Sequence, residues 1–150
     1  MAITISILTR RLKEGKTYED FRKAWYHNVG FGTKTKLYSA INIFDPREII
    51  VVSFTEVQPE QDPMKILRID VKERLDNPLN DIIEPEIGRT FGVVVAEDDF
   101  SQMGKLEYKP ASVNGKETDF EEISQGLALA QKLIAQAAQE RDAAGKNEKG

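Results

Sequence analysis

Polar side chains that alternate with branched apolar residues are the groups of this sequence best suited to bind a small molecule. Residues 2–10, 37–44 and 48–57 are β-rich runs in which such groups recur at every second position, and so share a face of a sheet. Hydroxyl and amide groups orient a ligand by hydrogen bonds without an acid–base pair. The candidate ligand-binding residues are Tyr38, Asn42, Thr4, Ser6 and Ser53. The alternative is that these groups only hydrogen-bond across the fold.

A second set of candidates is cationic and follows the ends of the expected strands. Guanidinium groups bind carboxylates and phosphates through paired hydrogen bonds, so a cluster of them would form an anion site. Arg10, Arg47 and Arg89 are the candidates for such a site at one edge of the sheet. Acidic residues, among them Asp45 and Glu86, are interspersed with the cations and dilute their field. The pattern therefore favours a solvated surface over an anion site.

Residue types that commonly serve as nucleophiles, general bases or metal ligands are scarce. The chain has no cysteine, which excludes thiolate nucleophiles, disulfides and cysteine-ligated metals. His27 is the single histidine, and a helical wheel places it opposite the apolar stripe of its helix, as expected of a surface residue rather than a general base. Phe21 and Trp25 lie on that stripe, where rings pack in a core more often than they hold a ligand. We assign no catalytic residue and expect no metal and no cofactor.

The elements that must position these residues follow from the apolar periodicity. Residues 2–10 predict a strand. Thr17 and Asp20 have the pattern of a helix N-terminus, before a stripe that runs to Val29. Residues 37–44 and 48–57 predict a hairpin that turns at Asp45-Pro46-Arg47. A second helix is predicted from Met64 to Leu75, and a fourth strand over residues 91–95.

This order of elements predicts an α+β fold of the ferredoxin-like βαββαβ type, an antiparallel sheet with two helices on one face. We expect this domain over residues 1–99. An arm and a C-terminal helix follow over 100–140, packed on the same domain or on a partner subunit, and residues 141–150 are expected to be a disordered tail. The C-terminal helix carries a heptad-like apolar seam, which consists of Phe120, Ile123, Leu127, Ala130, Ile134 and Ala137.

Two helices on one face of a sheet leave its other face uncovered. We expect the helix-facing residues to be Ile3, Ile5, Ile7, Ile41, Ile43, Ile50, Val52 and Phe54. The uncovered face then carries the polar candidates together with Ile49, Val51 and Val94, which is too apolar for solvent. A second copy, with the C-terminal helix or arm reaching across, would cover it, so we expect a homodimer. The alternative is a monomer whose own third helix caps the sheet.

About the first 97 residues resemble the dimeric α/β-barrel superfamily, which includes antibiotic-biosynthesis-monooxygenase-like and EthD-like branches. The resemblance rests on a first strand, then Thr17-Tyr18-Glu19-Asp20-Phe21-Arg22-Lys23-Ala24-Trp25, then a hairpin, a helix and a strand. It implies two sheets that close face to face into a barrel, and it permits cofactor-independent oxidation of an aromatic or polyketide-like substrate. Val29 stands where the EthD-like branch has a histidine, and no histidine lies between Asp62 and Asp76, where haem-degrading relatives have one.

Composition narrows the classes of function. Of 150 residues, 40% are hydrophobic and 31% are charged, which is typical of one globular domain. A net charge of −4 and a pI near 5.2 argue against a nucleic-acid partner. No basic leader and no long apolar run is found, so we expect a cytoplasmic protein with no membrane partner. The expected function is binding of a small aromatic molecule in the barrel; the alternative is a non-catalytic interaction or assembly module.

Overall fold

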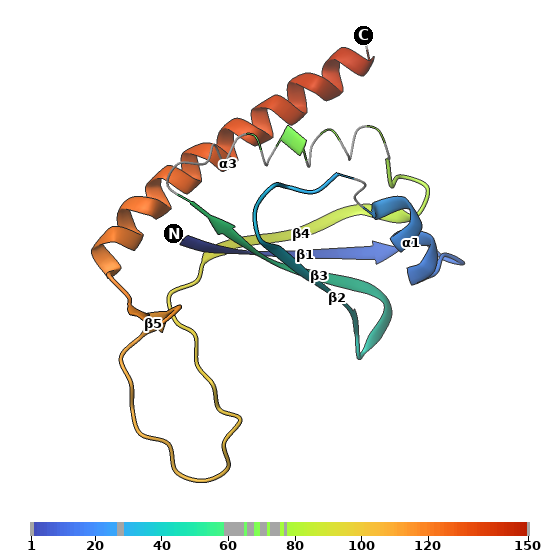
Figure 1. Ribbon diagram of the computed structural model, residues 1–150. Helices are drawn as coiled ribbons and strands as arrows, with labels where there is room; N and C mark the ends of the chain where they lie inside the picture. Colours follow the sequence, from blue (N-terminus) through green and yellow to red (C-terminus); the bar gives the residue numbers. More distant parts are fainter. Residues whose placement is uncertain are drawn as a thin grey trace.

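An open antiparallel sheet of four strands forms the centre of the molecule (Figure 1). The computed structural model describes residues 2–26, 29–58, 65, 68, 69, 72, 76 and 78–149. The strands of the sheet are β1 (Ala2–Leu12), β2 (Thr35–Asn42), β3 (Asp45–Val57) and β4 (Ile83–Val93). They lie in the order β2-β3-β1-β4, and every neighbouring pair is antiparallel. The predicted α+β class is confirmed.

Helix α1 (Tyr18–Trp25) begins at the capping box that the sequence predicts. Oγ1 of Thr17 accepts a hydrogen bond from the backbone N–H of Asp20 at 3.2 Å, and the Asp20 carboxylate accepts one from the N–H of Thr17 at 2.9 Å. The helix ends at Trp25, with Tyr26 as its C-cap, so the prediction that its stripe continues to Val29 is wrong. His27 lies outside the described residues.

The hairpin between β2 and β3 turns at Ile43 and Phe44, not at Asp45-Pro46-Arg47 as predicted. Asn42 accounts for the position of the turn, because its Oδ1 accepts a hydrogen bond from the backbone N–H of Phe44 at 2.8 Å. Asp45 and Pro46 instead begin β3, since a proline near the start of a strand costs no ladder hydrogen bond. The side chains of Ile43 and Phe44 are almost fully exposed, so Ile43 does not face a helix.

Strand β4 begins at Ile83, well before the predicted start at Phe91. It is an edge strand, where Pro85 is tolerated, and its glycines interrupt the apolar pattern on which the prediction depended. Most of the predicted second helix, from Met64 to Leu75, lies outside the described residues. The described residues of this stretch are Lys65, Arg68, Ile69 and Lys72; they are helical, as is Asp76 directly after it.

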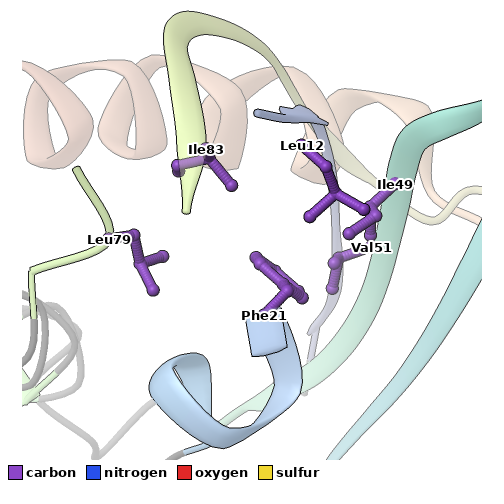
Figure 2. Close-up of a cluster of buried hydrophobic side chains, with 6 residues drawn as sticks. All are labelled: Leu12, Phe21, Ile49, Val51, Leu79 and Ile83. Atoms are coloured by element: carbon purple, nitrogen blue, oxygen red, sulfur yellow. The ribbon is translucent and has the colours of Figure 1, made fainter. Parts of the chain in front are cut away.

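The hydrophobic core lies between α1, the start of β4 and one face of the sheet (Figure 2). Phe21 is fully buried and stacks on Trp25, with ring centroids 5.8 Å apart. Both aromatic residues therefore pack in the core, as predicted. The other buried apolar residues of this cluster are Leu12, Ile49, Val51, Leu79 and Ile83.

The two faces of β1 and β3 are opposite to the prediction. Directly paired residues share a face, and Leu8 pairs with Val51, which is buried beside Phe21. We call this side of the sheet the core face. The side chains expected to face the helices lie instead on the other side, which we call the open face; they are Ile3, Ile5, Ile7, Ile50, Val52 and Phe54. Both alternating sets of β3 are apolar, so hydrophobicity does not fix the register, and a shift of one residue reverses every position.

Beyond β4 the chain forms a projecting loop and a long helix (Figure 1). The short strands β5 (Ser112–Val113) and β6 (Lys116–Glu117) close the loop. Helix α3 (Phe120–Lys149) continues through residues 141–149, which we expected to be a disordered tail. Phe120 and Leu127 of the predicted seam are 60% and 40% exposed, so neither is buried within this chain. Within the described residues, no helix has both the length and the apolar character that crossing a membrane requires.

Candidate functional site

The structure divides the predicted ligand-binding residues among three places. Thr4, Ser6 and Ser53 lie on the core face, since their register with β1 and β3 is the same as that of Leu8 and Val51. Tyr38 pairs with Val52, lies on the open face and is 51% exposed. Asn42 lies at the hairpin turn, where its Nδ2 donates to Glu48 at 2.6 Å. The five residues are therefore not brought together in one site.

The open face is an apolar surface with a few hydroxyl groups. The buried sheet residues among those described, such as Ile49 and Val51, lie on the core face. On the open face every described residue of the sheet keeps part of its surface in solvent. A continuous apolar surface that is left in contact with solvent is typical of a binding site. Its residues from β1, β2, β3 and β4 include Ile3, Ile5, Ile7, Thr9, Tyr38, Ile50, Val52, Phe54 and Thr90.

Gly88 and Gly92 of β4 lie on the open face, where two β1 side chains approach the strand closely. Gly88 pairs with Thr9 and Gly92 pairs with Ile5, so both glycines lie on this face. A Cβ at Gly92 would lie 3.1 Å from Cγ2 of Ile5, and one at Gly88 would lie 3.2 Å from Cβ of Thr9. The space above each glycine is thus occupied by a β1 side chain, and the two strands pack tightly at these positions. These glycines were not among the predicted site residues; their spacing of four positions within one strand indicates that they share a face.

Tyr38 gives the open face an aromatic ring and a hydroxyl group near its β2 edge. Lys36 pairs with Phe54 and so lies on the same face. The Nζ atom of Lys36 lies 5.1 Å from the centroid of the Tyr38 ring, within the range of a cation–π interaction. A hydrogen bond to the Tyr38 side chain raises the pKa of Lys36, and the negative charge of the ionised Tyr38 phenol raises it further. This corner of the face therefore combines a π surface with a firmly protonated amine.

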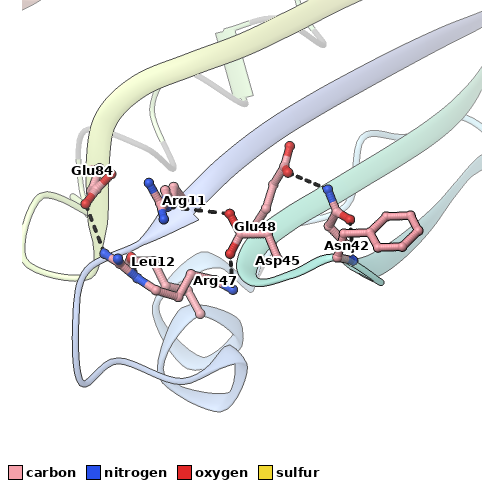
Figure 3. Close-up of polar contacts among 8 residues, drawn as sticks. Arg11, Leu12, Asn42, Asp45, Arg47, Glu48 and Glu84 are labelled. Carbon is pink, nitrogen blue, oxygen red and sulfur yellow. Dashed lines mark hydrogen bonds and ion pairs between the residues drawn. The ribbon is translucent and has the colours of Figure 1, made fainter.

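The arginines of the predicted anion edge have different surroundings. Arg10 is on the core face and only 8% exposed. Arg47 ties the hairpin to β4 (Figure 3), since its Nη2 lies 3.0 Å from Oε1 of Glu84 and its Nε donates to the carbonyl of Leu12 at 3.0 Å. The guanidinium group of Arg89 lies 5.9 Å from the centroid of Phe91. Arg47 thus joins β3 to β1 and β4.

A shallow groove of about 480 Å³ lies along the loop that precedes β2 and the start of that strand. Lys34 borders it and lies 3.9 Å from Glu56, while Thr33 donates to the carbonyl of Glu56 at 2.5 Å. The groove is broadly open to solvent and does not enclose a ligand as a typical binding pocket does. Its lining residues are Gly30, Phe31, Gly32, Thr33, Lys34, Thr35 and Leu37. In the part of the chain that the structure describes, no cluster of three or more acidic or histidine side chains could hold a metal ion.

No protein-family model, no curated protein and no solved structure matches this chain. The open face, with its Tyr38 corner, is the candidate binding surface of the described chain.

Proposed function

We propose that this protein binds a small, flat apolar or aromatic molecule on the open face of its sheet. The apolar surface of the open face carries the proposal, because Ile5, Ile7 and Val52 all keep part of their surface in solvent. Neighbouring strands lie about 4.8 Å apart, so roughly 14 Å separates β4 from β2. A molecule of a few fused rings spans that distance, with one end over β4 and the other at Tyr38 and Lys36.

The proposal includes a second copy of the chain, which covers the open face in a ferredoxin-like dimeric barrel. The strand order β2-β3-β1-β4 supports this plan, because it places β1 and β3 at the centre of the sheet and β2 and β4 at its edges. Full burial of a large apolar side chain is worth about 1.5–3 kcal/mol, so the isoleucines of the open face favour association. Two such faces would enclose a ligand that one face alone leaves in solvent. Cofactor-independent oxidation in that cavity remains a prediction of the family resemblance.

The alternative function is a non-catalytic assembly module. Its support is independent of the open face: large apolar side chains of the loop before β5, including Met103 and Tyr108, are exposed. In that case the dimer would form, and the open faces would pack on each other without space for a ligand.

Titration with 1-anilinonaphthalene-8-sulfonate, an aromatic anion that fluoresces in apolar sites, tests the binding proposal. Gly92→Ala adds a methyl group that Ile5 must shift to accommodate, which reshapes the apolar surface, and we expect the dissociation constant of the dye to rise roughly tenfold, as for one extra methyl group in an apolar pocket. Gly126→Ala in α3 is the matched control, because nothing lies within 4 Å of a Cβ at that position. Equal affinities for the two variants, both folded by circular dichroism, would contradict the proposal.

A further inference from the structure

The central part of the open face carries one charged side chain, that of Lys36. Rows of directly paired residues cross the sheet there, and each row takes one residue from β2, β3, β1 and β4. All of these residues belong to the described part of the chain, and apart from Lys36 they are apolar, hydroxyl-bearing or glycine. The rows consist of Lys36, Phe54, Ile5 and Gly92; of Tyr38, Val52, Ile7 and Thr90; and of Ala40, Ile50, Thr9 and Gly88.

The carboxylates that lie next to these rows on β3 already have partners within the chain. At one end of the open face, the Glu56 carboxylate lies 3.9 Å from Nζ of Lys34. At the other end, the Glu48 carboxylate accepts a hydrogen bond from Nδ2 of Asn42 at 2.6 Å. Neither acid therefore balances the charge of Lys36.

Lys36 itself contacts an aromatic ring instead of an acid. Its Nζ atom lies 5.1 Å from the centroid of the Tyr38 ring, and no ion pair joins it to a carboxylate of the described residues. The face of an aromatic ring attracts a cation through its quadrupole but supplies no net negative charge. In the single chain the Lys36 side chain is exposed, so water solvates its ammonium group.

A second copy over the open face would not supply the missing negative charge. In the proposed dimer, the surface that faces these rows is the same surface of the partner, so its rows repeat the lysine and contain no carboxylate. A charged group that loses water without gaining an opposite charge is strongly unfavourable. The countercharge for Lys36 must then come from the molecule that lies between the two faces.

We propose that the ligand of the open face is an aromatic carboxylate whose acidic end is bound by Lys36. This inference rests on the proposed function and adds the charge of the ligand to it. The carboxylate accepts a charge-assisted hydrogen bond from Nζ of Lys36. One ring of the ligand contacts Tyr38, and the rest of its ring system lies over Val52 and Ile7. A single ammonium group is a compact point charge and matches one negative charge.

Fluorescence titration with two ligands of the same ring system tests the role of the charge. Anthracene-2-carboxylate and anthracene-2-carboxamide differ only at the acidic end. We expect the wild-type protein to bind the carboxylate roughly tenfold more tightly, as for a hydrogen bond to a charged group. Lys36→Gln should lose this preference with its affinity for the carboxamide unchanged, and Lys36→Arg should keep it.

Lys116→Gln is the control for net charge, because it removes the same charge from a lysine of β6, outside the four-stranded sheet. This variant should bind both ligands as the wild type does. Equal affinities of the wild type for the two ligands, or a preference that persists in Lys36→Gln, would overturn the inference and leave the binding of aromatic molecules intact. Failure of the wild type to bind either ligand would instead overturn the proposed function.

Charge reversal tests whether Lys36 meets the charged end of the ligand. Lys36→Glu should bind the cationic analogue anthracen-2-ylmethylammonium more tightly than the carboxylate, which is the reverse of the order expected for the wild type. The wild-type order in Lys36→Glu would show that the charged end lies elsewhere.

Sedimentation equilibrium without ligand distinguishes a ligand carboxylate from one of the partner subunit. Lys36→Gln should not weaken the dimer, because the facing rows of a second copy hold no acid. A weaker dimer would place the countercharge on the partner subunit and overturn the inference.

Discussion

The cost of removing a side chain here depends on its burial more than on its type. Phe21 is fully enclosed by the core and stacks on Trp25, whereas Phe44 lies at the hairpin turn and is almost fully exposed. We expect Phe21→Ala to lower the free energy of unfolding by about 3–5 kcal/mol, because it leaves a cavity. Phe44→Ala should change it by less than about 0.5 kcal/mol. Urea denaturation followed by circular dichroism measures both, and similar losses would mean that the core is placed wrongly.

Arg47 and Glu84 form the ion pair that joins the hairpin to β4. Their side chains are about one-third exposed and lie 3.0 Å apart, whereas Lys23 and Glu19 on α1 are mostly exposed and lie 3.8 Å apart. A double-mutant cycle with glutamine at Arg47 and Glu84 should give a coupling energy of about 1 kcal/mol. The same cycle on the α1 pair should give only about 0.3–0.5 kcal/mol. Equal coupling energies would show that Arg47 does not hold the two strands together.

At the scale of elements, the start of α1 gives the folded state a dependence on pH. Hydrogen bonds from the backbone and side chain of Thr17 lower the pKa of Asp20 from its ordinary value of 3.8. The carboxylate is thus favoured in the folded chain, so its contribution is complete above the unfolded pKa and is lost as pH falls through the lowered value. We expect Asp20→Asn to reduce the fall in melting temperature between about pH 5 and pH 2.

Elements with strong local sequence signals could be predicted, but the side of the sheet on which their side chains lie could not. The capping residues Thr17 and Asp20 act through contacts three residues apart, so the start of α1 follows from the sequence. The turn at Ile43 and Phe44 depends on one bond of Asn42, which competes with the more obvious signal of Pro46. The faces of β1 and β3 depend on the packing of Ile49 and Val51 against Phe21, a contact between distant parts of the chain. Sequence periodicity contains no such information when both faces are apolar.

At the scale of the whole molecule, the facing of β1, β2 and β3 decides where the predicted site residues lie. Tyr38 was placed on the open face correctly, since the predicted phase of β2 holds in the structure. The hydroxyl groups of Thr4, Ser6 and Ser53 lie on the core face, because the two faces of β1 and β3 are opposite to the prediction. Gly88 and Gly92 were not assigned to this face because most of β4 was not predicted to be a strand. Whichever alternating set of β1 and β3 side chains lies on the core face, the other set is apolar as well. The expectation of a partner therefore does not depend on which set that is.

That expectation leads to a prediction for the assembled protein. Light scattering at micromolar concentration should give twice the chain mass of 16.9 kDa, and the melting temperature should rise with protein concentration, because only the folded state associates. Val52→Lys places a charge at the centre of the open face and should produce a folded monomer with a melting temperature independent of concentration. Ser39→Lys, at an exposed position of β2 on the core face, should remain a dimer. If both lysine variants stay dimeric, the open face is not the surface through which the two copies meet.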